Sequence, residues 1–116
     1  MNFYSYNKCG TCRKAKKLLD KYKVSYDEID ITETPPSKTV LKRAMKAIGM
    51  KKLFNTSGVQ YRSLKIKEII GIMTETQALD LLSGNGRLVK RPIAVDENRI
   101  TVGFDESEYK EVWSQD

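Results

Sequence analysis

The side chains best suited to chemistry in this sequence are two cysteines, Cys9 and Cys12, the only two among its 116 residues. Gly10 and Thr11 separate them, and a Cys-x-x-Cys spacing allows the pair to alternate between two thiols and one disulfide. Two cysteines in a chain of this length do not form a disulfide scaffold of the secreted type. We therefore predict a redox pair in a cytoplasmic protein.

Histidine is absent. This removes the usual general base, the Cys-His and Ser-His catalytic pairs, and zinc sites that need imidazole. Two cysteines also exclude a four-cysteine zinc site within one chain. We expect no metal and no bound cofactor, and the residues give no sign of nucleotide or flavin binding. An external thiol such as glutathione is the remaining candidate co-reactant.

Positive charge is concentrated around the cysteines. The net charge is +6, from 21 Lys or Arg against 15 Asp or Glu, and the segment 8–23 carries seven basic residues and one acidic residue. A general nucleic-acid binder spreads its basic residues over a larger face, and no nucleic-acid-binding motif is present. No apolar run approaches the roughly 20 residues that span a bilayer. We expect no direct binding to nucleic acid or membrane.

The first third of the chain predicts a strand, a helix and a second parallel strand. Residues 2–6 alternate as a strand does, and apolar residues recur at helical spacing from Cys12 to Tyr22. Residues 24–31 predict the second strand. A βαβ unit has a right-handed crossover, so the loop holding Cys9 should lie at the carboxyl end of the first strand.

The remainder predicts helices followed by a hairpin. Ser37 is a plausible N-cap for a helix that ends at Gly49, residues 55–58 have the composition of a turn, and residues 64–73 suggest a short helix. Thr74 and Gln77 have capping-box spacing for a helix that stops at residues 84–86. Residues 92–104 predict an antiparallel hairpin, and Asp105 precedes the last helix.

This order of elements predicts an α/β, thioredoxin-like fold. The plan is β-α-β, then helices, then β-β-α, with a helical insertion at about 36–88 between the two halves. No repeat or linker divides the sequence. We predict one domain over residues 1–116.

The predicted start of the first helix gives Cys9 its chemistry. Unpaired backbone N–H groups and the positive end of the helix dipole favour a thiolate there, and Lys8 and Arg13 add positive charge. In such surroundings a cysteine pKa falls from about 8.5 into the range of roughly 3.5 to 7.5. The alternative is that the basic residues only solvate the outer face of the helix.

Cys12, one turn further on, can attack a sulfur carried by Cys9 and so resolve an adduct. The alternative is that Cys12 is an inert core residue at the start of the buried helix face. Arg91 and Pro92 precede the hairpin strand. Arg91 can bind an oxyanion or pair with the Cys9 thiolate, or lie on the surface, and Pro92 can be cis or an ordinary trans residue that begins a strand.

Taken together, these motifs resemble the ArsC/Spx family of thioredoxin-fold proteins. The family includes glutaredoxin-coupled arsenate reductases, Spx-type redox regulators of RNA polymerase, and small uncharacterised members. The similarity runs nearly end to end. Its most specific segments are Lys8-Cys9-Gly10-Thr11-Cys12-Arg13-Lys14-Ala15, Phe54-Asn55-Thr56-Ser57-Gly58, Lys90-Arg91-Pro92-Ile93-Ala94-Val95 and Ile100-Thr101-Val102-Gly103-Phe104.

The resemblance implies roles for several residues. Cys9 is then the catalytic or sensing cysteine, Arg91 the arginine that pairs with the oxyanion or thiolate, and Pro92 a cis-proline facing the site. The arsenate reductases carry further arginines at positions that fall near Asn55 and Gly103 here. The Spx branch contacts the polymerase alpha subunit through a glycine near Gly49, which is also explained as a helix C-cap.

Three functions follow as hypotheses. The first is a thiol-dependent oxidoreductase of the arsenate reductase type, in which Cys9 attacks, Cys12 or an external thiol resolves, and Gly10, Thr11 and nearby backbone amides hold negative charge. Glutaredoxin, thioredoxin or glutathione would supply electrons. The second is a redox regulator that binds the RNA polymerase alpha subunit. The third is a thioredoxin-fold domain with an inert cysteine pair.

Overall fold

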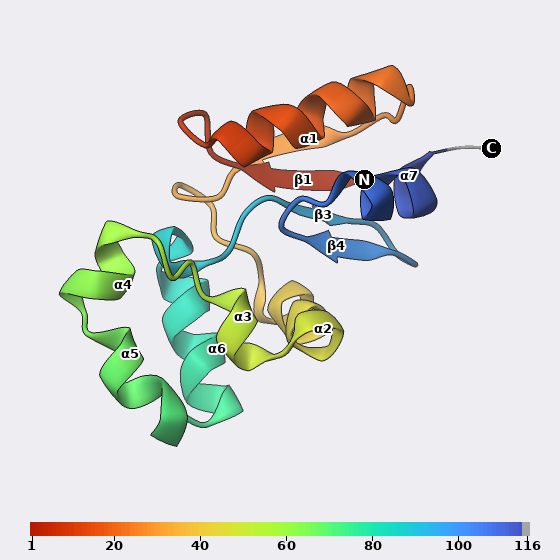
Figure 1. Cartoon of the computed structure of the whole chain (residues 1–116). Coiled ribbons are helices and arrows are strands. Elements are labelled where there is room, and N and C mark those ends of the chain that lie inside the picture. Colours follow the sequence, from red (N-terminus) through yellow and green to blue (C-terminus); the bar gives the residue numbers. More distant parts are fainter. Residues whose placement is uncertain (115–116) are drawn as a thin grey trace.

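A four-stranded mixed sheet lies at the centre of the protein (Figure 1). The computed structural model describes residues 1–114. The strand order is β2-β1-β3-β4; β1 and β2 are parallel, whereas β3 is antiparallel to both β1 and β4. The predicted α/β, thioredoxin-like class is confirmed. The strands are β1 (Asn2–Ser5), β2 (Asp27–Asp30), β3 (Ile93–Val95) and β4 (Ile100–Val102).

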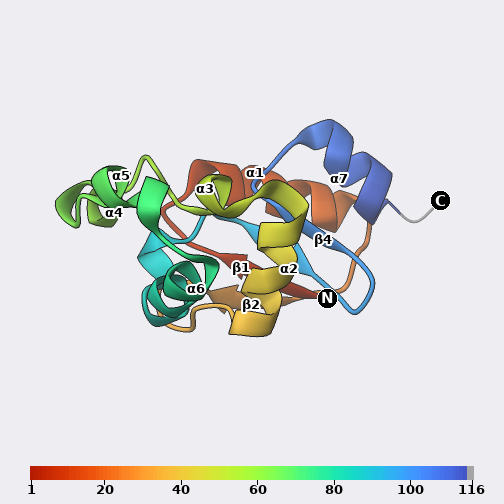
Figure 2. The same cartoon turned by 90° about the horizontal axis from the view of Figure 1, so that it is seen from below.

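Alternation along the strands sends side chains to two separate cores. Phe3 faces the core beneath α1 (Gly10–Lys21) and α7 (Glu106–Trp113), whereas its neighbour Tyr4 faces the opposite core. Figure 2 shows α1 and α7 on the same side of the sheet, above its strands in that view. Trp113 is fully buried there and donates its indole N–H to Thr101 Oγ1 over 2.9 Å. This layer fixes α1, and with it the cysteine loop, against the sheet.

A group of helices between β2 and β3 covers the other face and extends beyond it (Figures 1 and 2). The predicted domain range of 1–116 runs two residues past the described chain. Within residues 1–114 no helix has the length and apolar character needed to cross a membrane. The helices are α2 (Lys38–Ile48), α3 (Met50–Leu53), α4 (Val59–Ser63), α5 (Ile66–Ile69), η1 (Ile70–Ile72), α6 (Glu75–Gly84) and η2 (Gly86–Leu88).

Local capping explains where the longer of these helices begin. The Ser37 side chain accepts a hydrogen bond from the Val40 N–H, and Thr74 with Gln77 forms the complete capping box. Gly49 ends α2 with φ 90°, a value that favours glycine. These three predicted signals are confirmed.

Two predicted elements differ from the structure. The second strand covers only Asp27–Asp30, because Val24 packs into the core beneath α1 and α7 instead of joining the sheet. The predicted helix over residues 64–73 is divided into α5 and η1, and Lys65 just before it has left-handed dihedral angles, φ 54° and ψ 41°. A left-handed residue cannot continue a right-handed helix, so the segment turns there.

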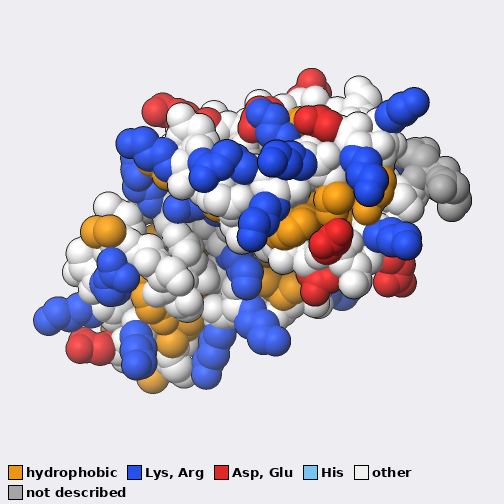
Figure 3. Space-filling model, turned by 45° about the horizontal axis from the view of Figure 1, so that its top comes forward, with side chains coloured by type: hydrophobic (Ala, Val, Ile, Leu, Met, Phe, Trp, Pro, Cys, Tyr) orange, Lys and Arg blue, Asp and Glu red, His pale blue; other side chains and the backbone are white. Residues whose placement is uncertain are grey.

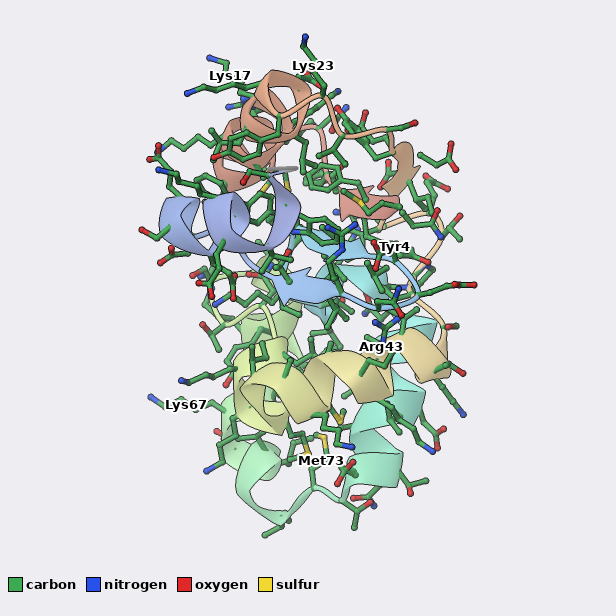
Figure 4. The ribbon with its side chains drawn as sticks, turned by 90° about the vertical axis from the view of Figure 1, so that its right-hand side faces the viewer. Tyr4, Lys17, Lys23, Arg43, Lys67 and Met73 are labelled. Carbon is green, nitrogen blue, oxygen red and sulfur yellow. The ribbon has the colours of Figure 1, made fainter. Side chains whose placement is uncertain are left out.

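Two contacts join the helical group to the sheet. Arg43 of α2 donates to the backbone oxygens of Asp96 (2.7 Å) and Arg99 (3.3 Å) in the β3–β4 turn, and Figure 4 shows Arg43 between α2 and that hairpin. At the other end, Gly86 lies so close to Ile31 that a Cβ at residue 86 would come within 1.7 Å of the Ile31 carbonyl oxygen. Glycine is therefore required where η2 meets the end of β2.

Candidate active site at the start of helix α1

Cys9 is the N-cap of α1, as the sequence predicts. Its backbone is extended (φ −98°, ψ 116°), its N–H donates to the Tyr6 carbonyl oxygen at 3.0 Å, and its sulfur accepts the Cys12 N–H at 3.3 Å. The Thr11 hydroxyl lies 3.0 Å from the same sulfur. The sequence folds this way because a short polar loop follows β1 and the first helical N–H groups need an acceptor, which the sulfur provides.

These contacts favour the thiolate of Cys9. Partial burial works against the charged form, but hydrogen bonds from Cys12, Thr11 and Arg91 outweigh it and hold the pKa of Cys9 below its ordinary value. The sulfur is also half-buried rather than enclosed, so a small substrate can reach it. A thiolate that is accessible in this way is a nucleophile.

Cys12 has the opposite surroundings. It is only 3% exposed, on the inner face of α1. Burial, together with the hydrogen bond to Cys9, raises the pKa of Cys12 to about 12. The two sulfurs, one helical turn apart, therefore differ in acidity: the surroundings favour the thiolate at Cys9, and Cys12 stays protonated at neutral pH.

Arg91 reaches this site from the segment before β3. Its guanidinium is the last of the groups that lower the pKa of Cys9, after Cys12 and Thr11. The Arg91–Pro92 peptide bond is cis, and the Pro92 carbonyl oxygen accepts the Gly103 N–H at 2.8 Å.

The other predicted site residues take different positions. Gly10 is the first residue of α1, and Thr11 contacts the sulfur directly. Arg13 turns back and donates to the Asn7 carbonyl oxygen at 3.1 Å, so it binds the loop, and Lys8 is exposed on that loop. The Cys9 sulfur is thus contacted by the Thr11 hydroxyl and the Cys12 N–H, and basic side chains gather on the surface over α1 (Figure 3).

Gly49 lies apart from the cysteines, at the junction of α2 and α3 in the helical group. It lines a surface hollow whose other lining residues come from α2, α3 and α6: Lys42, Arg43, Met45, Lys46, Met50 and Glu75. The structure therefore separates the cysteine site from the predicted partner-binding residue by the thickness of the sheet.

Two residues beside the site, Tyr6 and Arg87, were not predicted from the sequence. The Arg91 guanidinium carbon lies 4.8 Å from the centre of the Tyr6 ring, and that of Arg87 lies 5.8 Å from it. Both distances allow a cation–π interaction. Tyr6 looks like an ordinary strand residue in the sequence, and only the close approach of Gly86 to β2 brings Arg87 near it.

The positions near Asn55 and Gly103 carry no arginine, and the structure shows what they do instead. The Asn55 N–H donates to the Leu88 carbonyl oxygen at 2.7 Å, which joins the helical group to the segment before β3. Gly103 has φ 78°, and a Cβ there would come within 2.8 Å of the Lys90 side chain. Both residues have backbone roles at the edge of the site.

A mixed sheet ordered β2-β1-β3-β4, a Cys-x-x-Cys pair at the start of α1 and a cis-proline before β3 define a thioredoxin-like protein. The family model for the ArsC family matches residues 4–112. The chain belongs to the ArsC family.

Individual relatives agree with this assignment. The uncharacterized protein YusI of Bacillus subtilis is 47% identical over 116 residues, which is 98% of each chain. The global transcriptional regulator Spx of Streptococcus agalactiae is 29% identical over 88% of this chain and 74% of its own length. A crystal structure described as a possible arsenate reductase from Streptococcus mutans UA159 is 40% identical, covers 89% of each chain and has a TM-score of 0.82.

Proposed function

We propose that this protein is a thiol-disulfide oxidoreductase in which Cys9 is the nucleophile and Cys12 the resolving cysteine. The observation that carries the proposal is the contrast between the two sulfurs: Cys9 is accessible and favoured as a thiolate, whereas Cys12 is buried and protonated. Such a pair needs a reducing compartment such as the cytoplasm to return to its active form.

The reaction follows from these two states. The Cys9 thiolate attacks one sulfur of a substrate disulfide, forms a mixed disulfide and releases the other half as a thiolate. Cys12 then gives up its proton and attacks the Cys9 sulfur. The second half of the substrate leaves with that proton as a thiol, and the protein keeps a Cys9–Cys12 disulfide. Glutaredoxin, thioredoxin or glutathione then reduces this disulfide and is itself oxidised.

An arsenate-type oxyanion is the second substrate class for the same nucleophile. Arg91, Thr11 and the N–H groups at the start of α1 are the groups available to hold it. Asn55 and Gly103 supply backbone contacts where the family's reductases carry arginines. We therefore rank disulfides ahead of arsenate as substrates.

A coupled assay tests both classes. Reduced protein is mixed with a glutathionylated peptide or with arsenate, in the presence of glutaredoxin, glutathione reductase and glutathione, and NADPH consumption is followed. We expect turnover with the peptide above the background that glutaredoxin and glutathione give in the presence of Cys9→Ser. Turnover of neither substrate above the Cys9→Ser background would contradict the proposal.

A second candidate function is a redox regulator that binds the RNA polymerase alpha subunit. The supporting observation is that Gly49 lies in a surface hollow bordered by basic residues of α2. Its test is a pull-down with the isolated alpha subunit, using the reduced and the oxidised protein. Binding that depends on redox state and is lost in Lys46→Glu would favour the regulator, and no binding in either state would exclude it.

A further inference from the structure

A cavity of about 430 Å³ lies beside the cysteine pair, on the β2 side of α1. Buried Cys12 contributes to its wall, so the cavity adjoins the resolving sulfur. It also lies where the parallel strands β1 and β2 end, which is where open α/β sheets bind ligands. Its lining residues are Ser5, Asn7, Cys12, Arg13, Lys16, Glu28 and Asp30.

The cavity carries charges of both signs. Lys16 and Glu28 face each other across it with a 2.8 Å ion pair, and Ser5 donates to the second carboxylate oxygen of Glu28 at 2.9 Å. Both carboxylate oxygens of Glu28 therefore already have partners within the protein. Such a lining is unfavourable for arsenate or another simple oxyanion, because two carboxylates would face it.

One cation and one anion of the lining keep binding capacity. Arg13 donates one guanidinium N–H to Asn7, which leaves other N–H groups for a ligand carboxylate. Asp30 accepts both hydrogen bonds of Thr32 on Oδ1, which leaves Oδ2 for a ligand ammonium. Thr32 lowers the pKa of Asp30, with a smaller contribution from Arg87, so its carboxylate is ionised at neutral pH.

We propose that this cavity binds the α-amino acid group of a small disulfide, with the ligand carboxylate on Arg13 and the ligand ammonium on Asp30. Cystine and glutathione disulfide both carry this zwitterionic group, at different distances from their sulfurs. The proposal rests on the proposed function and names the substrate class of the same site.

The chemistry balances without a further cofactor. Cys9 attacks one sulfur of the disulfide and releases one half as a thiolate, and the other half remains on Cys9 with its zwitterionic group in the cavity. Cys12 then attacks the Cys9 sulfur and the second half leaves as a thiol. One substrate disulfide becomes two thiols, and the protein dithiol becomes one disulfide.

The test compares disulfides that differ in charge. Reduced protein at pH 7 reacts in a single turnover with cystine, glutathione disulfide, the dication cystamine, the dianion dithiodipropionate and the neutral bis(2-hydroxyethyl) disulfide. Released thiol is measured, and each rate is divided by the rate of the same disulfide with N-acetylcysteine. We expect at least one zwitterionic disulfide to exceed the neutral one by about fivefold, as partly exposed ion pairs allow.

Matched variants locate the effect. Asp30→Asn keeps an oxygen that can accept from Thr32 but removes the charge, and Asp27→Asn removes an equally exposed charge on the same strand that does not line the cavity. We expect Asp30→Asn to lose the zwitterion preference and keep the rate with the neutral disulfide. A second pair is Arg13→Gln against Lys17→Gln, because Lys17 projects outward from α1 (Figure 4), and we expect only Arg13→Gln to lose the preference.

Each outcome separates the two proposals. A preference for cystine places the zwitterionic group next to the reacting sulfur, and one for glutathione disulfide alone places it further away; both support the cavity. Equal normalised rates, or a fastest reaction with dithiodipropionate, overturn the zwitterion site and leave the oxidoreductase proposal standing. No thiol release from any disulfide contradicts the oxidoreductase proposal itself.

Discussion

The surroundings of Cys9 and Cys12 differ more than their separation of one helical turn suggests. Cys9 precedes the first turn of α1, where N–H groups and a hydroxyl point at its sulfur and solvent reaches it. Cys12 lies on the inner face of the same helix, 3% exposed. The difference follows from helix geometry, because a residue before the first turn meets unpaired donors and one three positions later faces the core.

Under the proposed function, this contrast gives a chain without histidine an activated nucleophile. The backbone, Thr11 and Arg91 together replace the base that a Cys-His pair would supply. The neighbouring thiol stays protonated because it is buried. The different roles of the two cysteines therefore depend on the position of each sulfur on the helix. Changes at Cys9 and changes at Cys12 can each test this difference.

Exchanging the reactive sulfur has the largest expected effect. At pH 7, Cys9→Ser should slow alkylation by iodoacetamide at least about 100-fold, because the remaining thiol is buried and its pKa is raised. Cys12→Ser should keep the fast reaction. Mass spectrometry of the alkylated protein measures both. Fast alkylation of Cys12 in the Cys9→Ser protein would contradict the assignment.

Unfolding at alkaline pH tests whether burial raises the pKa of Cys12. The native pKa of Cys12 is raised to about 12, so the native state retains a proton that the unfolded chain loses near pH 8.5. The protonated Cys12 thiol contributes its full stabilisation below about pH 8.5, and this contribution is lost as the pH rises toward 12. The equilibrium constant for folding decreases by at most about tenfold per pH unit in this range. The free energy of unfolding, measured in urea at several pH values, should decrease less steeply with pH in Cys12→Ala than in the wild type.

Removing the Arg91 charge should raise the pKa of Cys9 by up to about one unit. Arg91→Gln takes away one of the groups that lower the pKa of Cys9, and we expect that pKa to rise and the thiolate fraction at a pH below it to fall by up to about tenfold. The pH dependence of alkylation, or thiolate absorbance at 240 nm, measures this. Arg87→Gln is the control, since Arg87 contacts Tyr6 and is not among the groups that shift Cys9.

The Tyr6 ring should have the smallest effect of the four. Tyr6→Leu removes the surface on which the Arg91 guanidinium rests, and we expect the Cys9 pKa to rise by a few tenths of a unit, consistent with about 0.5–1 kcal/mol for such a contact. Tyr6→Phe keeps the ring and should leave the pKa unchanged. An equal shift in both variants would show that the hydroxyl, rather than the ring, matters.

Local signals in the sequence were sufficient for the sheet plan and the cysteine loop. Alternation in residues 2–5, the Cys-x-x-Cys spacing and the capping box at Thr74 and Gln77 each depend on a few adjacent residues, and each appears where expected. The helix predicted over 64–73 begins only at Ile66, because the left-handed backbone of Lys65 has no marker such as glycine in the sequence. Arg91 was a candidate from its residue type, but only the family resemblance favoured pairing with Cys9 over an ordinary surface position.

Contacts between distant segments supplied the rest of the site. Tyr6 and Arg87 are 81 positions apart by their residue numbers, and no periodic pattern connects a strand end with a short 3₁₀ turn. The mixed-charge cavity likewise combines α1 with the ends of β1 and β2, whose acidic residues look like ordinary exposed positions in the sequence. Such groupings depend on packing, which local propensity does not encode.

The closeness of Gly86 to the Ile31 carbonyl has a consequence for how this family member can vary. Even a methyl group at residue 86 would have to push η2 off the end of β2, and the stretch that leads to Arg91 begins only a few residues later. An uncharged side chain at residue 86 would thus displace Arg87 and Arg91, the two cations beside the Cys9 site. The reactivity of the Cys9 sulfur therefore depends on the missing side chain of residue 86, although glycine carries no charge.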